Sequence, residues 1–120
     1  MTDMDSFMDR IIERLQQVVE EETALLRANS VVDLTDFNTR KSQGLYDLSR
    51  AMHRLGEQRP GPETLARMHS LRGALEANQA ALSAHLHAVR EIATIVSDAI
   101  QEFESDGTYA PPFKRAGGRA

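Results

Sequence analysis

The sequence predicts an all-α protein: an elongated antiparallel bundle or coiled coil of three helices, with a long C-terminal helix and a flexible tail. Apolar residues recur every three or four positions through most of the chain. All four prolines stand in two short segments, and there is no Trp. Hydrophobicity comes instead from Leu, Ala, Ile, Val and Met, a mixture typical of long helices. We expect a bundle domain over residues 1–105 and a tail over 106–120.

The first helix is expected over residues 5–29, where a heptad seam is clear. The seam consists of Met4, Met8, Ile11, Leu15, Val18, Glu22 and Leu25. Four further apolar residues widen it into a stripe broad enough for two partner helices: Phe7, Ile12, Val19 and Leu26. Glu22 is the one charged residue in the seam. It either reaches water or marks the place where a neighbouring helix ends.

The second helix is expected over residues 34–57, after a tight turn or kink. Ser30 with Asp33 three residues later resembles a capping box, and Thr35 is another possible cap. Lys41 and Gly44 interrupt the apolar pattern. A glycine inside a helix costs about 1 kcal/mol against alanine, so Gly44 indicates either close packing or a weak point.

The stretch "GEQRPGPE" separates the second helix from the third. Gly56 is suited to cap the second helix, and Pro62 to the first turn of the third. We expect the third helix over residues 63–104, about 60 Å at 1.5 Å per residue, against about 36 Å for each of the others. Because the third helix is longer than either of the others, three arrangements can bury its seam. The first two helices lie end to end along it, or all three form a bundle from which part of it protrudes, or two chains pair. The first two arrangements fit an elongated bundle, and the oligomeric state stays open.

No residue pattern indicates catalysis, a metal site or a cofactor. His85 and His87 stand two apart on different helix faces, and His53 and His69 are isolated, so all four read as surface residues. There is no GxSxG elbow, and "RAGGRA" follows no strand as a phosphate loop would. Asn78 interrupts the third helix at its seam, beside Gln79. It either fixes register as a buried polar residue or faces solvent.

Charge and composition exclude further classes. Net charge is −4, with +2 in the last fifteen residues and −6 in the rest, which argues against nucleic acid as a partner. The sequence contains no run of about 18 apolar residues, the length that would predict a membrane-spanning helix. The acidic start "MTDMDSFMDRIIERL" does not read as a secretory signal, and there is no cysteine. We therefore expect a cytoplasmic protein.

The tail carries two aromatic residues, Tyr109 and Phe113, near a proline pair and basic residues. They either fold back onto the bundle or form a short linear motif that docks in a partner's groove. Prolines lower the conformational entropy lost on such docking. The preceding "SDG" would then act as a hinge.

Three stretches resemble FlgN-type flagellar export chaperones. "LLRANSVVDLTDFNTRKSQGLYDL" is similar to the family's leucine pair and small polar turn before a helix with a basic residue. "ALEANQAALSAHLHAVREI" is similar to the family's last helix, and "SDGTYAPP" to its Gly-Tyr-containing tail. The resemblance implies a non-catalytic protein. Members bind C-terminal helices of unassembled hook–filament junction proteins and deliver them to the type III export gate.

On this resemblance a client helix would lie along the second half of the third helix. Its expected contacts are Leu82, Leu86, Val89, Ile92, Val96, Ile100 and Phe103. Tyr109 would contact the export gate component. The alternative is a self-associating coiled-coil adaptor without a client, so a homo-oligomer stays possible. A more distant alternative is a regulator that sequesters a transcription factor through the same helix.

Overall fold

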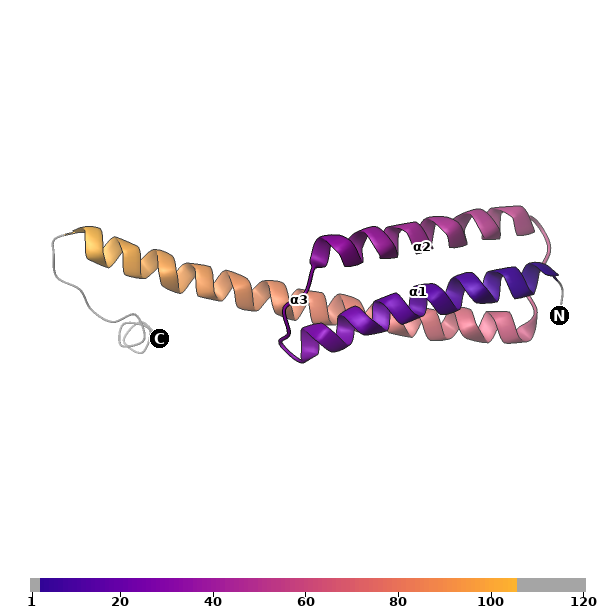
Figure 1. The fold of residues 1–120 in the computed structure, drawn as a ribbon, viewed down its shortest axis with the longest axis horizontal. Coiled ribbons are helices and arrows are strands. Elements are labelled where there is room, and N and C mark those ends of the chain that lie inside the picture. Colours follow the sequence, from indigo (N-terminus) through magenta and orange to yellow (C-terminus); the bar gives the residue numbers. More distant parts are fainter. Residues whose placement is uncertain (1–2, 106–120) are drawn as a thin grey trace. The chain divides into compact units, whose positions relative to one another are not determined.

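A computed structural model of the chain describes residues 3–105. They form three helices and no strand: α1 (Asp3–Arg27), α2 (Leu34–Leu55) and α3 (Pro62–Ser105) (Figure 1). The all-α fold class and the long C-terminal helix are confirmed. The expected helix limits agree with the observed ones to within two residues at every end.

The chain divides after Leu82 into two compact units. In the first unit, α1, α2 and the beginning of α3 lie side by side as a three-helix bundle (Figure 1). The described part of the second unit is the remainder of α3, residues 83–105.

The position of this division follows from the lengths of the partner helices. Asp9 bonds to Thr64, and Thr23 bonds to Asn78, so α1 and α3 run parallel with an offset of 55 residues. The same offset places Arg27, the last residue of α1, level with Leu82. The first unit thus ends at the level where α1 ends.

The turn into α2 is capped by Asp33. Its Oδ1 accepts a hydrogen bond from the backbone N–H of Asp36 at 3.0 Å, satisfying a donor of the first turn. The expected cap at Ser30 is wrong, because that residue still closes α1: its N–H donates to the carbonyl of Leu25 at 3.0 Å. Thr35 lies inside the helix.

The turn between α2 and α3 has the expected chemistry. Gly56 caps α2 with φ +63°, a left-handed conformation that favours glycine, and its N–H donates to the His53 carbonyl. Pro62 is the first residue of α3. The N–H of Gly61 donates to Oδ1 of Asp5 at 3.2 Å, which ties this turn to the start of α1.

The core of the bundle lies mainly along α1. It consists of Met8, Ile11, Ile12, Leu15, Val19, Leu48, Ala51 and Leu71. Gly44 allows α2 to approach this core closely, because a Cβ there would lie 2.8 Å from Cδ1 of Leu15. Of the two expectations for Gly44, close packing is the one observed.

Candidate partner-binding surface

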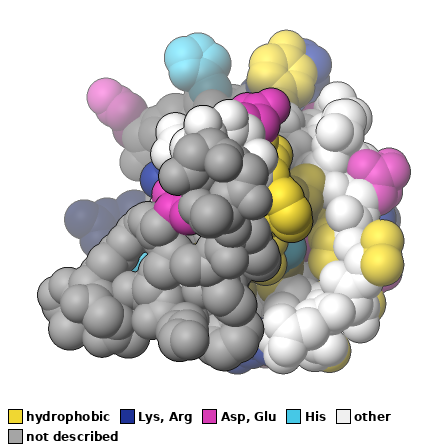
Figure 2. Space-filling view, turned by 90° about the vertical axis from the view of Figure 1, so that its left-hand side faces the viewer, with side chains coloured by type: hydrophobic (Ala, Val, Ile, Leu, Met, Phe, Trp, Pro, Cys, Tyr) yellow, Lys and Arg dark blue, Asp and Glu magenta, His cyan; other side chains and the backbone are white. Residues whose placement is uncertain are grey.

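The second unit carries a stripe of exposed apolar side chains, here called the α3 stripe. Its exposed fractions run from 48% at Leu86 to 65% at Phe103. The stripe consists of Leu86, Val89, Ile92, Ile95, Val96, Ile100 and Phe103. Apolar side chains also reach the surface beside charged ones in the space-filling view (Figure 2). A contiguous exposed patch of this kind marks an interaction surface more often than scattered single residues do.

The α3 stripe is unusually wide for a helix. At 100° per residue, its members and the neighbouring Ala88, Ala93 and Ala99 fall within about half of the helix circumference. His85 and Glu104 are the polar residues within that arc. A face of this width can contact one partner helix broadly, or two partner helices at its edges.

Six of the eight residues expected to bind partners belong to the α3 stripe. Leu82 does not: it is half-buried and is the last residue of the first unit. Tyr109 lies outside the described residues, as does Phe113. Ile95, which the expectation omitted, is 54% exposed and joins the stripe.

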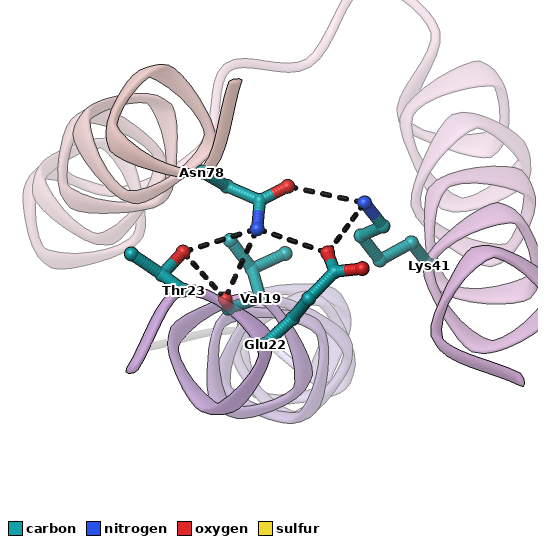
Figure 3. Close-up of polar contacts among 5 residues, drawn as sticks. All are labelled: Val19, Glu22, Thr23, Lys41 and Asn78. Carbon is teal, nitrogen blue, oxygen red and sulfur yellow. Dashed lines mark hydrogen bonds and ion pairs between the residues drawn. The ribbon is translucent and has the colours of Figure 1, made fainter. Parts of the chain in front are cut away.

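A buried polar network joins all three helices of the first unit (Figure 3). Nζ of Lys41 in α2 lies 2.7 Å from Oε1 of Glu22 in α1 and donates to Oδ1 of Asn78 in α3 at 3.1 Å. Nδ2 of Asn78 in turn donates to Oε1 of Glu22 at 2.9 Å. Each of the three side chains therefore contacts the other two.

Two more groups complete the network. Nδ2 of Asn78 also lies 3.0 Å from Oγ1 of Thr23 and 3.5 Å from the Val19 carbonyl. The Thr23 hydroxyl donates to the same carbonyl at 2.9 Å. Each of these buried polar side chains thus has a hydrogen-bond partner within the bundle, as is usual for buried polar groups. These directional bonds fix the register of the helices against one another.

This network decides between the alternatives left open for the seam. Glu22 is 1% exposed and paired, so both expectations for it, contact with water and the end of a neighbouring helix, are wrong. Asn78 is 3% exposed, so it does not face solvent. Gln79 is exposed. Lys41, which interrupts the apolar pattern of α2, is the counterion of Glu22.

A groove of about 420 Å³ between α1 and α2 gathers four arginines: Arg10, Arg14, Arg50 and Arg54. Phe7, Ile11 and Ala51 supply its apolar lining, and Asp47 its acidic one. This cluster was not predicted from the sequence. The available signal was two arginine pairs, each with four-residue spacing, in an otherwise acidic domain.

The histidines offer no metal centre. All four are exposed, as expected. His87 has a partner that was not predicted: its Nε2 lies 3.5 Å from Oε1 of Glu91, four residues further along an exposed helix face. Residues 3–105 contain no group of three or more His, Cys, Asp or Glu side chains placed to hold a metal ion.

No helix among residues 3–105 is long and apolar enough to cross a membrane. Comparisons with protein families, with curated proteins and with solved structures found no match for this chain.

Proposed function

We propose that this chain is a non-catalytic binding protein that holds an amphipathic helix of another protein along the α3 stripe. The observation that carries this proposal is the exposure of seven large apolar side chains on one face of one helix, at 48–65% each. Helices of globular proteins normally bury such a face. Recognition of an apolar helix face by a partner helix uses the same i, i+3, i+4, i+7 spacing that the α3 stripe presents.

The specific form of the proposal is a cytoplasmic export chaperone. Its clients are the C-terminal helices of unassembled hook–filament junction proteins, which it delivers to the flagellar type III export gate. The resemblance of three stretches to FlgN-type chaperones supports this form. Covering the apolar face of a client helix prevents premature polymerisation, because that face is then unavailable to other subunits. Tyr109 is assigned to contact with the export gate component.

Charge beside the α3 stripe favours a particular kind of client. Residues 83–105 contain one basic residue, Arg90, and four acidic ones: Glu91, Asp98, Glu102 and Glu104. A client helix with lysines or arginines flanking its apolar stripe therefore gains favourable electrostatic interactions, which act chiefly on association rate and specificity.

The proposal is tested by a pair of matched variants and a client segment. Val89→Asp combined with Val96→Asp places two carboxylates in the α3 stripe, whereas Thr94→Asp places one on the opposite, polar face. Isothermal titration calorimetry would use the C-terminal helical segment of a hook–filament junction protein.

We expect the wild type and Thr94→Asp to bind this segment equally. The double variant should bind at least about 100-fold more weakly, because burying an unpaired carboxylate against a client is costly. All three proteins should keep the same helical content by circular dichroism, since the changed residues are exposed. Equal affinity for all three proteins would refute binding at the α3 stripe.

A second candidate is a self-associating coiled-coil adaptor, and one observation favours it. If Leu86, Ala93 and Ile100 are heptad a positions and Val89, Val96 and Phe103 are d positions, then the e positions are Arg90, Ser97 and Glu104. In an antiparallel pair, e positions face each other. Arg90 of each copy then meets Glu104 of the other.

Light scattering separates the two candidates. The adaptor requires a dimer that Arg90→Glu weakens and that Arg90→Glu combined with Glu104→Arg restores. The chaperone requires that client addition gives a one-to-one complex, whatever the state of the free protein. A dimer that persists unchanged with excess client would favour the adaptor.

A further inference from the structure

We infer that the arginine groove of the first unit is a second binding surface, and that its ligand is an acidic peptide segment of a partner protein. This inference is independent of the proposed function, because the groove is built from α1 and α2 alone. It would give the protein two separate surfaces, one apolar and one cationic.

Helix geometry explains how the groove forms. Arg10 and Arg14 stand four residues apart on α1, and Arg50 and Arg54 stand four residues apart on α2, so each pair shares one helix face. Packing of α2 against α1 brings the two pairs to the same groove. Each pair spans about 6 Å along its helix at 1.5 Å per residue.

The positive charge of the groove is poorly compensated within the described chain. Ion pairs among residues 3–105 involve Arg40, Lys41, Arg67 and His87 as the basic partner, and none of the four groove arginines. Asp47, the acid in the lining, accepts a hydrogen bond from Gln43 at 3.0 Å. Four exposed guanidinium groups around one carboxylate therefore leave a local excess of positive charge, although the first 105 residues sum to −6.

The lining of the groove identifies the chemistry of the ligand. Guanidinium groups bind carboxylates through two parallel hydrogen bonds, which gives geometric specificity. Phe7, at 39% exposed, offers an apolar surface between the charges, and the buried Ile11 and Ala51 form the floor of the groove. A ligand that uses both features carries carboxylates on either side of an apolar side chain.

A peptide segment fits this description better than a nucleic acid or a lipid surface does. Carboxylates four residues apart on a helix repeat at about 6 Å, the same spacing as each arginine pair. Nucleic acid binding rests on neutralising many phosphates, which the acidic body of this protein opposes. Asp47 inside the groove likewise repels a dense polyanion. A peptide with separated charges can place its carboxylates on the arginines and away from Asp47.

The side chain of Arg50 is restricted by a contact with Tyr46. Cζ of Arg50 lies 5.8 Å from the ring centre of Tyr46, within the range of a cation–π contact. This contact restricts the side chain without using its hydrogen-bond donors. Less conformational entropy is then lost when Arg50 binds a carboxylate.

The test uses a defined probe and matched variants of the full chain. The probe is a fluorescein-labelled helical peptide in which Glu pairs, four residues apart, flank a Leu. A second peptide has Gln in place of each Glu. The groove variant is Arg14→Gln combined with Arg50→Gln. The control, Arg27→Gln combined with Arg72→Gln, removes the same charge from exposed positions outside the groove.

Fluorescence anisotropy should show binding of the Glu peptide to the wild type and to the control within 2-fold of each other, about the effect of a small change in net charge. The groove variant should bind at least about 10-fold more weakly, and the Gln peptide should bind no protein tightly. The Val89→Asp, Val96→Asp variant should bind the probe like the wild type, so this test is independent of the α3 stripe. Circular dichroism confirms that each variant is folded.

Three results would overturn the inference. One is no binding of the Glu peptide to the wild type. Another is an equal loss in the groove and control variants, which would mean general electrostatic attraction. The third is binding to phosphatidylserine vesicles that the groove variant abolishes while the peptide stays unbound, which would mean a lipid surface.

Discussion

The two parts of α3 differ in a way that runs against the usual distribution of apolar residues. Within the bundle, the buried residues of α3 are Thr64, Leu71 and Asn78, two of them polar. Beyond Leu82, the helix carries Ile, Val, Leu and Phe side chains that are about half exposed or more. The more apolar part of α3 is therefore the part whose large side chains are exposed.

The residues of α3 that stabilise the fold are therefore different from the residues that it exposes for binding. In the bundle, α3 is fixed by directional polar bonds to α1 and α2, which specify one register. In the second unit, the apolar face adds little to stability, because it stays in contact with water. Substitutions in the two parts should consequently affect different properties, stability in one and binding in the other.

The largest expected effect is on the buried ion pair of the bundle. Lys41→Met removes the partner of Glu22, whose side chain is 1% exposed, and should lower the free energy of unfolding by about 3–5 kcal/mol. Arg40→Met is the matched control. Its exposed pairs with Glu21 and Asp36 should contribute less than about 1 kcal/mol. Urea unfolding followed by circular dichroism measures both, and equal losses would refute the importance of burial here.

The next effect compares leucine and isoleucine in the two parts of α3. Leu71→Ala removes a side chain that is 3% exposed and should lower the free energy of unfolding by about 2–5 kcal/mol. Ile92→Ala changes a side chain that is 61% exposed and should cost less than about 0.5 kcal/mol beyond helix propensity. A large loss for Ile92→Ala would mean that the α3 stripe is already packed in the free protein.

Alanine substitutions of two glycines inside helices should change the free energy of unfolding by smaller amounts and in opposite directions. Gly44→Ala forces a Cβ within 2.8 Å of Leu15, which is buried and cannot move away freely, so it should cost about 1–3 kcal/mol. The Cβ that Gly73→Ala adds has no atom within 4 Å, so this change should raise the free energy of unfolding by about 0.5–1 kcal/mol. Thermal unfolding of both variants tests this contrast. Stabilisation by both would contradict the close helix approach.

The smallest expected effect on stability is that of Tyr109→Ala. This change should leave the melting temperature and client affinity unaltered and should weaken binding to the export gate component. Surface plasmon resonance with each partner in turn would measure this. Loss of both interactions, or of neither, would refute the assignment of separate roles to the α3 stripe and Tyr109.

Much of the fold follows from local features of the sequence. Gly56 and Pro62 end one helix and begin the next through their own backbone preferences, so those limits were predictable. The cap of α2 was predicted less well, since Ser30 and Asp33 both have capping side chains. Two hydrogen bonds decide between them: that from the Asp36 N–H to Asp33, and that from Ser30 back to α1.

The polar features of the bundle were not predictable because their partners are distant in sequence. Glu22 bonds to Asn78, 56 residues away, and to Lys41 on another helix. The arginine groove likewise needs two pairs from different helices to meet. The α3 stripe was largely foreseen, because a helix face depends only on residues three and four apart.

Hydrogen exchange along α3 tests the central claim most directly. In the free protein, amides of residues 83–105 should exchange faster than those of residues 62–82, because the large apolar side chains of residues 83–105 are exposed. Adding the client segment should slow exchange at least about 10-fold in residues 83–105 and leave residues 62–82 unchanged. Equal protection of both parts in the free protein, or protection by the client only in residues 62–82, would contradict an open apolar face that receives a partner helix.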